Sequence, residues 1–264
     1  AKYFNVLLAS PARSEMILGT IDVSSDISFQ VWSNYAWGNL VKVATSVGAN
    51  DARRMGAAYE QLSGDAIAAY KKSSSDYAPK YRIWNGAGWG AEAPAQTIGS
   101  GSINWIRMEP KHGSDDIMLV TEDSNRDLYA QVWNGNSWGN AVLLESDTET
   151  NAYQAFDVAY EQSSGKAMVV WSNRDSNKPR YRTWNGASWS AQATPLTRMR
   201  VPGSQDSSCV GTSEAAVKVT IRTVPLMAAE PTMVHGKSID GHGSKLSKSK
   251  PGAGRIVVSN LSSV

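Results

Sequence analysis

The sequence predicts an all-β protein that consists of about four similar antiparallel units of four strands each, followed by a C-terminal tail low in aromatic residues. Three observations predict this organisation. A Trp-x4-Trp motif recurs four times, short alternating segments bounded by turn residues surround each copy, and helical periodicity is absent from residues 1–197.

The tryptophan pairs define the repeat. Their first members are 52, 49 and 51 residues apart; the pairs are Trp32/Trp37, Trp84/Trp89, Trp133/Trp138 and Trp184/Trp189. A longer period overlies this one, because residues 15–39 match residues 116–140 at an offset of 101 and 58–61 match 159–162. The repeating object is therefore a pair of unlike units that occurs twice. We place the four units at about 1–50, 51–100, 101–150 and 151–197.

The fourth unit shows the expected strands most clearly, at 156–160, 167–171, 180–184 and 189–194. Asn185-Gly186 predicts a two-residue type I′ hairpin, because both central positions of that turn need positive φ. Four short strands within about 50 residues are typical of a propeller blade. We therefore expect a β-propeller or propeller-like array of about four four-stranded antiparallel blades, closed as a ring or open as an arc that another copy completes.

Composition changes near residue 197. All ten Trp, ten Tyr and three Phe precede residue 198, and residues 198–264 carry nine Lys/Arg against four Asp/Glu, which leaves a net charge of −3 for 1–197. A segment without aromatic anchors buries little apolar area, so we expect a partly extended Ser/Gly/Lys-rich tail. Residues 217–221 and 255–258 could add strands to an open edge. The tail either folds with the repeats or has a separate origin.

Composition also excludes several classes of partner. The net charge of +2 gives no argument for nucleic acid or a membrane surface, and no apolar run approaches the roughly 20 residues that span a bilayer. A single cysteine, Cys209, excludes an internal disulfide framework and a multi-thiolate zinc site. Calcium could bind acidic loops, but Asp also caps turns, so we expect no metal and no cofactor; these loop residues are Asp22, Asp26, Asp123 and Asp127.

Catalytic motifs are missing from the sequence. Its histidines are His112, His235 and His242, and it contains no Gly-x-Ser-x-Gly, His-Glu-x-x-His or phosphate-loop motif. No two acidic residues stand out as a catalytic pair. We therefore expect that the protein is not an enzyme.

Strand alternation places a Gln or Arg beside the first tryptophan of each pair, at Gln30, Arg82, Gln131 and Arg182. The second tryptophans follow the hairpins, nearer the rim, and are Trp37, Trp89, Trp138 and Trp189. An aromatic ring can stack on a pyranose while Arg or Gln donates to its hydroxyls, so we predict that these eight residues bind ligand. The alternative is packing between blades, which we favour for the tryptophans inside strands, Trp32, Trp84, Trp133 and Trp184.

The string Arg/Gln-x-Trp-Asn-Gly-x-x-Trp resembles the repeats of propeller lectins of the fucose-binding and tectonin type, which carry a Trp-Asp-Gly-x-x-Trp hairpin. The resemblance covers residues 1–197 as a pattern and implies a lectin-like scaffold. In the fucose-binding family a glutamate three residues before the first tryptophan holds sugar hydroxyls. This sequence departs from the family there, with Phe29, Tyr81, Ala130 and Tyr181.

The tail carries a second resemblance. Residues 235–249 are similar to the Lys-Met-Ser-Lys-Ser loop of class I aminoacyl-tRNA synthetases, whose lysines contact the phosphates of ATP. No His-Ile-Gly-His-type motif and no βαβ frame precede it, and a Lys/Ser/Gly-rich composition can produce such a string.

We expect from these features a noncatalytic extracellular or cell-surface protein that binds a glycan or another surface ligand through the rim of its repeats. The alternative is a structural subunit that self-assembles into a filament or surface layer through open blade edges or the tail. No signal peptide is present in this chain, so export is inferred from composition and resemblance.

Overall fold

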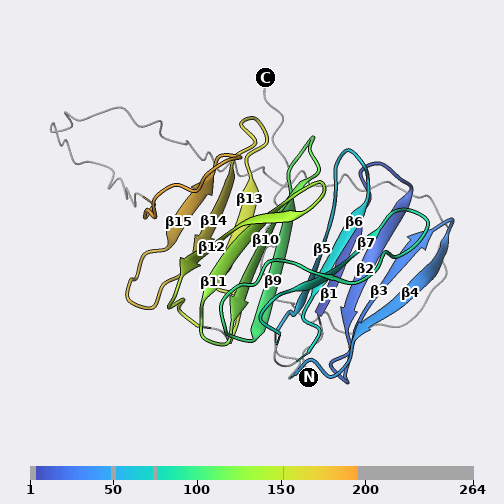
Figure 1. The fold of residues 1–264 in the computed structure, drawn as a ribbon, viewed down its shortest axis with the longest axis horizontal. Helices are drawn as coiled ribbons and strands as arrows, with labels where there is room; N and C mark the ends of the chain where they lie inside the picture. Colours follow the sequence, from blue (N-terminus) through green and yellow to red (C-terminus); the bar gives the residue numbers. More distant parts are fainter. Residues whose placement is uncertain (1–3, 49–51, 74–75, 151, 196–264) are drawn as a thin grey trace, which may run out of the picture. The chain divides into compact units, whose positions relative to one another are not determined.

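A computed structural model describes residues 4–48, 52–73, 76–150 and 152–195, which form four antiparallel sheets (Figure 1). This confirms the predicted all-β, propeller-like fold. The predicted tail 198–264, with Cys209, the strands expected at 217–221 and 255–258 and the string at 235–249, lies outside the described residues. The described residues include no helix long and apolar enough to cross a membrane.

Each sheet is one blade, and its strands pair in chain order. Blade 1 contains β1 (Phe4–Ala9), β2 (Glu15–Ile21), β3 (Ile27–Ser33) and β4 (Ala36–Ala44). Blade 2 contains β5 (Met55–Tyr59), β6 (Ala66–Tyr70), β7 (Lys80–Trp84) and β8 (Ala93–Pro94). Blade 3 contains β9 (Ile103–Pro110), β10 (Asp116–Asp123), β11 (Leu128–Asn134) and β12 (Trp138–Glu145), and blade 4 contains β13 (Phe156–Tyr160), β14 (Ala167–Trp171) and β15 (Arg180–Trp184).

Blade 4 corrects one prediction, since residues 189–194 form no continuous strand. They make two isolated bridges, Trp184 to Trp189 and Tyr181 to Ala193. In this blade the Arg182 Nε donates to the carbonyl of Ser190 at 2.8 Å. The arginine side chain thus takes the carbonyl directly after the second tryptophan as its hydrogen-bond acceptor. Blade 2 has the same arrangement and a fourth strand of only two residues.

The hairpins correct a second prediction. The two-residue turn with positive φ at both central positions occurs in blade 1, at Asn34 (φ 50) and Tyr35 (φ 62). The three Asn-Gly hairpins are four-residue loops between directly paired tryptophans. In blade 2 the Asn85 Oδ1 accepts from the backbone N–H groups of Ala87 (3.0 Å) and Gly88 (2.9 Å). The asparagine therefore caps the loop through its side chain, and only the glycine takes positive φ.

Three hydrophobic clusters fill the three spaces between consecutive blades. The face of blade 1 that carries Ile17, Phe29 and Val31 packs on the tryptophan-bearing face of blade 2. A second cluster joins blades 2 and 3, and a third joins blades 3 and 4. Consequently β5 and β6 are buried on both faces, whereas β13 alternates between buried and exposed residues. In each packed pair the first tryptophan of a blade faces the blade before it.

The 101-residue period corresponds to two successive copies of one blade pair, blades 1–2 and blades 3–4, which occupy opposite sides of Figure 1. Two pairs of residues 101 apart contact each other between these copies. The rings of Phe4 and Trp105 lie 5.7 Å apart edge to face, and the Arg53 guanidinium donates to the Gln154 amide oxygen at 2.8 Å. These contacts join equivalent positions of the two blade pairs directly.

Candidate functional site: the arginine–tryptophan hairpins

The predicted ligand-binding tryptophans differ in exposure. Trp37 is 45% exposed, Trp138 is 8% exposed, and Trp89 and Trp189 are partly buried. Each packs against its partner across the hairpin in a tilted or edge-to-face arrangement, with ring centroids 5.3–5.6 Å apart. The first tryptophan of each pair was expected to pack between blades. Three of these four tryptophans are buried there: Trp84, Trp133 and Trp184.

The glutamines and arginines also fall into two groups. Gln131 is buried, and its side-chain oxygen accepts from the backbone N–H of Gln96 at 3.0 Å, so its polar group binds the protein itself. Gln30 is partly buried on blade 1. Arg82 and Arg182 both donate to the carbonyl of the residue after the second tryptophan, at 2.6 Å to Gly90 and 2.8 Å to Ser190.

Blade 4 brings one predicted arginine directly onto one predicted tryptophan. The guanidinium carbon of Arg182 lies 6.0 Å from the ring centroid of Trp189, within the range of a cation–π contact. The Ser190 carbonyl holds the guanidinium in this position. The result is a fixed pair of a cation and an aromatic face on the hairpin, with both side chains partly exposed.

In blade 2 the equivalent residues, Arg82 and Trp89, have different neighbours. The indole N–H of Trp89 donates to the carbonyl of Asn39 in blade 1 at 2.7 Å, and its ring lies 6.1 Å from that of Phe29. Trp89 therefore bridges two blades beside Arg82. Both even-numbered blades thus place the arginine on the carbonyl next to the second tryptophan, and in blade 4 the guanidinium also lies over the tryptophan ring.

Sequence reasoning missed an acidic group in the blade 2 site. Glu92 accepts hydrogen bonds from the Tyr70 hydroxyl (2.7 Å) and the Lys72 ammonium (3.0 Å). Burial raises the pKa of Glu92, but these bonds and the positive charges of Lys72 and Arg82 outweigh it and hold the pKa below its ordinary value. Glu92 lies outside the repeated motif, three residues after Trp89, and blade 4 has Gln192 at the same distance from Trp189. The difference in charge between Glu92 and Gln192 was the signal in the sequence that could have identified the acidic group.

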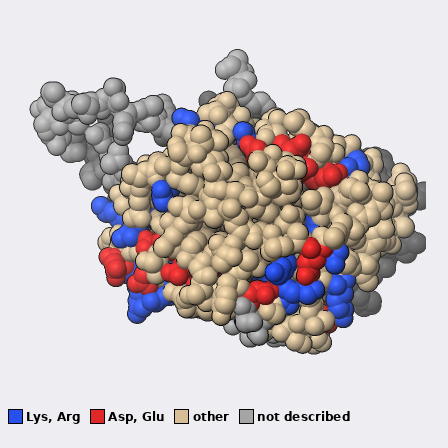
Figure 2. All heavy atoms as spheres, viewed as in Figure 1, with Lys and Arg blue, Asp and Glu red and all other residues tan. Residues whose placement is uncertain are grey.

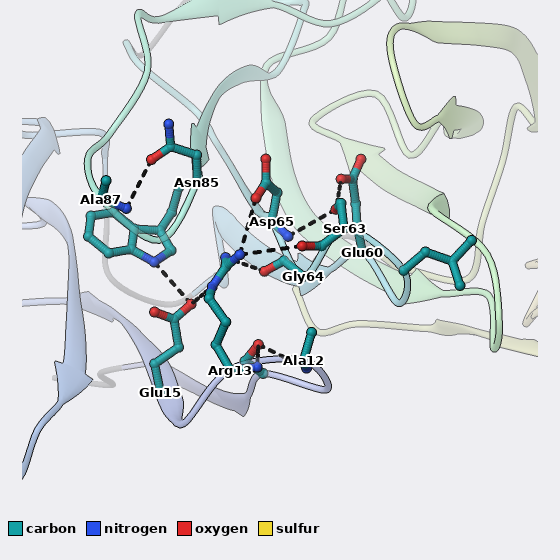
Figure 3. Close-up of polar contacts among 12 residues, drawn as sticks. Ala12, Arg13, Glu15, Glu60, Ser63, Gly64, Asp65, Asn85 and Ala87 are labelled. Carbon is teal, nitrogen blue, oxygen red and sulfur yellow. Dashed lines mark hydrogen bonds and ion pairs between the residues drawn. The ribbon is translucent and has the colours of Figure 1, made fainter.

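A charged cluster joins blades 1 and 2 at the β1–β2 loop (Figure 3). Arg13 binds Glu15 (Nε–Oε1 3.0 Å) and reaches the β5–β6 loop at Ser63, Gly64 and Asp65. The buried Glu15 also accepts from the Trp84 indole N–H at 3.1 Å. The cluster fixes the first tryptophan of blade 2, so it positions the hairpin rather than presenting free groups to a ligand.

The acidic loops considered for calcium cap their own backbones. Asp22 accepts from the N–H groups of Ser24 and Asp26, both at 2.9 Å. Asp123 makes the same bonds 101 residues later, to Asn125 and Asp127. Within the described chain, no group of three or more His, Cys, Asp or Glu side chains is placed to hold a metal ion.

Charge is mixed on the surface that Figure 2 shows. Acidic and basic side chains lie together in small groups, and no extended area of that face carries one sign. Such a surface gives little long-range steering toward a highly charged ligand.

No protein-family model matches the sequence, and no curated protein matches it. Solved structures do match the fold. The BP39L lectin from Burkholderia pseudomallei matches with a TM-score of 0.51 at 12% identity, over 73% of this chain and 54% of that one. The fucose-recognising lectin of Aleuria aurantia, a six-bladed β-propeller, matches with a TM-score of 0.44 at 15% identity, over 72% and 60%.

The catalytic domain of an α-L-arabinofuranosidase from Coprinopsis cinerea also matches, with a TM-score of 0.41 at 15% identity, over 70% of this chain and 66% of that one. At such identities the likeness concerns the fold alone, and the BP39L match supports a propeller-type architecture. This chain spans little more than half the length of the lectins it matches.

Proposed function

We propose that the protein is a noncatalytic carbohydrate-binding protein whose sites are the arginine–tryptophan hairpins of blades 2 and 4. The observation that carries the proposal is the contact between Arg182 and Trp189, held by the Ser190 carbonyl. A neutral pyranose has an apolar face and a ring of hydroxyls, and it needs an aromatic surface and fixed donors side by side.

The remaining donors of Arg182 support this assignment. A guanidinium has several N–H groups in a fixed plane and no acceptor. The described hydrogen bond of Arg182 uses only Nε. Because the side chain is already immobilised, ligand binding does not have to order it, which lowers the entropic cost of association.

The two sites differ in chemistry, so we propose that they differ in preference. Blade 2 adds the carboxylate of Glu92 and the ammonium of Lys72 beside its arginine. Blade 4 has Gln192 and Asn173 in the corresponding positions. A carboxylate accepts hydrogen bonds from sugar hydroxyls, so blade 2 offers acceptors as well as donors.

An extracellular or cell-surface location is part of the same proposal, because glycans of that environment are the ligands such a site fits. Its support is the composition of the repeats and their resemblance to propeller lectins. Assembly into a filament or surface layer stays a prediction.

Tryptophan fluorescence and calorimetry against a panel of neutral monosaccharides and disaccharides test the proposal. Replacing Trp189 with Ala should weaken binding at blade 4 at least tenfold, because the stacking surface is removed. Trp37→Ala is the matched control, since this tryptophan also follows a hairpin and is exposed but has Gln30 in place of an arginine. The proposal fails if no sugar in the panel binds, or if both variants lose affinity equally.

A further inference from the structure

Blades 2 and 3 show how two blades of this chain fit together. Blade 2 contributes one surface, its back face, made of Ala58, Ile67, Ala69, Tyr81 and Ile83. Blade 3 contributes the opposing surface, its tryptophan face, made of Met108, Ile117, Leu119, Trp133 and Trp138. Eight of these ten side chains are at most 8% exposed, so the two faces form a dry interface.

The two outer blades carry the same two faces, but solvent reaches them. Blade 1 has the tryptophan face 101 residues earlier, made of Leu7, Met16, Leu18, Trp32 and Trp37. Blade 4 has the back face 101 residues later, or 100 after its shorter loop, made of Ala159, Met168, Val170, Tyr181 and Thr183. Leu7 is 56% exposed, Trp37 45% and Met168 43%. Large apolar side chains at interface positions are therefore left open at both ends of the array.

A hollow marks the unfilled position on blade 1. It has a volume of about 510 Å³ and is lined by Trp32, Tyr35 and the β1–β2 loop around Ser14. On blade 3 the equivalent loop is covered by the β5–β6 loop of blade 2. There Gln61 N–H donates to the Ser114 carbonyl at 3.2 Å, and Leu62 N–H donates to the Asp115 carboxylate at 2.8 Å.

A hydrogen-bonded pair of side chains is also joined in the inner interface and separated on the two outer blades. At the interface of blades 2 and 3, Glu60 accepts the indole N–H of Trp133. The counterparts 101 residues away are Glu161 on blade 4 and Trp32 on blade 1. Glu161 accepts instead from Ser163 and Ser164 of its own loop. Both halves of this interface are thus present on the chain without being joined to each other.

We propose that the back face of blade 4 packs on the tryptophan face of blade 1 of a second copy of this chain, with Glu161 of one copy accepting the Trp32 indole N–H of the other. The internal interface of blades 2 and 3 is the direct precedent for the residues, their order and their polar pair. Because the two faces differ, the contact is head to tail, and it produces a closed ring or a growing chain according to the rotation between copies.

Sedimentation velocity of the full chain over a wide concentration range tests this proposal. The wild type should increase in mass with concentration. Leu7→Glu and Met168→Glu each place a charge on one of the two faces at a side chain already exposed, so both variants should remain monomeric and folded. Leu143→Glu is the control, because Leu143 is also 43% exposed but belongs to β12, outside both faces, and this variant should associate like the wild type.

Mixing the two variants identifies the geometry. The Met168→Glu chain keeps an intact blade 1 face and the Leu7→Glu chain keeps an intact blade 4 face, so an equal mixture should form one dimer and nothing larger. A wild type that is monomeric at every concentration overturns the proposal. That result is expected if the two faces meet within one chain, or if the chain's own tail covers both of them. Association that persists in both variants, or a mixture that stays monomeric, overturns it as well.

Discussion

Buried and partly buried carboxylates accept indole N–H bonds at several places in this protein, across or within blades. Glu15 binds Trp84 at 3.1 Å and Glu145 binds Trp171 at 3.1 Å. Glu145 also accepts from the Arg180 guanidinium at 2.7 Å. Burial raises the pKa of Glu145, but the hydrogen bonds from Trp171 and Arg180 outweigh it and lower the pKa. A buried indole N–H needs an acceptor, so each carboxylate fixes the orientation of a large ring.

Glu122 is the buried carboxylate whose charge is least compensated. It is fully buried in β10 and accepts one hydrogen bond, from the Thr148 hydroxyl. Burial raises its pKa to about 7, against the weaker lowering effect of Thr148. A raised carboxyl pKa means that the folded state holds the proton more tightly than the unfolded state. The contribution of Glu122 to stability is therefore greatest below the ordinary pKa of Glu and is lost as the pH rises through about 7.

Glu122→Gln should remove this dependence, because the amide stays neutral and can still accept from Thr148. We expect the free energy of unfolding of the wild type to fall by about 3 kcal/mol between pH 4.5 and pH 8 relative to the variant. Urea unfolding across that range measures the difference, with the exposed Glu149→Gln as control. Parallel pH profiles for wild type and Glu122→Gln would contradict the assignment.

The sequence predicted the positions of some residues of the site and did not identify others. Two-residue alternation placed Arg82 and Arg182 beside their tryptophans correctly, because it depends only on strand geometry. Glu92 was missed because its contact with Tyr70 depends on how far β8 departs from a regular strand. The burial of Trp138 depends on Tyr81 of the neighbouring blade, which no local pattern reports.

At the scale of elements, the blades differ in the length and turn type of the hairpin between their tryptophans. The sequence predicts a two-residue turn at Asn185-Gly186, but there and in the two other Asn-Gly hairpins the asparagine side chain caps a longer loop. The prediction counted two residues between the strands, whereas the directly paired tryptophans leave four in the loop. Loop length then decides the turn type, and the asparagine supplies acceptors that the backbone of a two-residue turn would not need.

Gly186 is the loop position at which only glycine is unstrained. Its φ is +97, and a Cβ there would meet no atom within 4 Å, so the conformation alone determines the cost of a side chain. Gly186→Ala should lower the free energy of unfolding by about 1–2 kcal/mol.

Gly139→Ala is the control for that change, because it also has open space and lacks positive φ. We expect an effect within about 0.5 kcal/mol. Thermal unfolding of the two variants compares them directly, and an equal effect at both positions would contradict the role assigned to the loop.

At the scale of the whole molecule, the repeat was visible in the sequence because equivalent residues keep their spacing over 101 positions. The offset identified the blade pair, and the structure adds what spacing alone does not give, the packing of each tryptophan face on the preceding blade. This order explains why the four hairpins are not equivalent. Trp84, Trp133 and Trp184 are covered by the blade before them, and the hairpin of blade 1 has no such neighbour in the described chain.

The central claim is that the described residues between 4 and 195 form two successive copies of one blade pair, with the tryptophan face of each later blade packed on the blade before it. A crystal structure of the full chain tests this most directly. We expect residues 4–48 to superimpose on 105–149, with Phe4 against Trp105 and Arg53 against Gln154 between the two copies. Helical backbone between residues 4 and 195 would contradict the claim. So would a distance larger than the width of a blade between Phe4 and Trp105, or between Arg53 and Gln154.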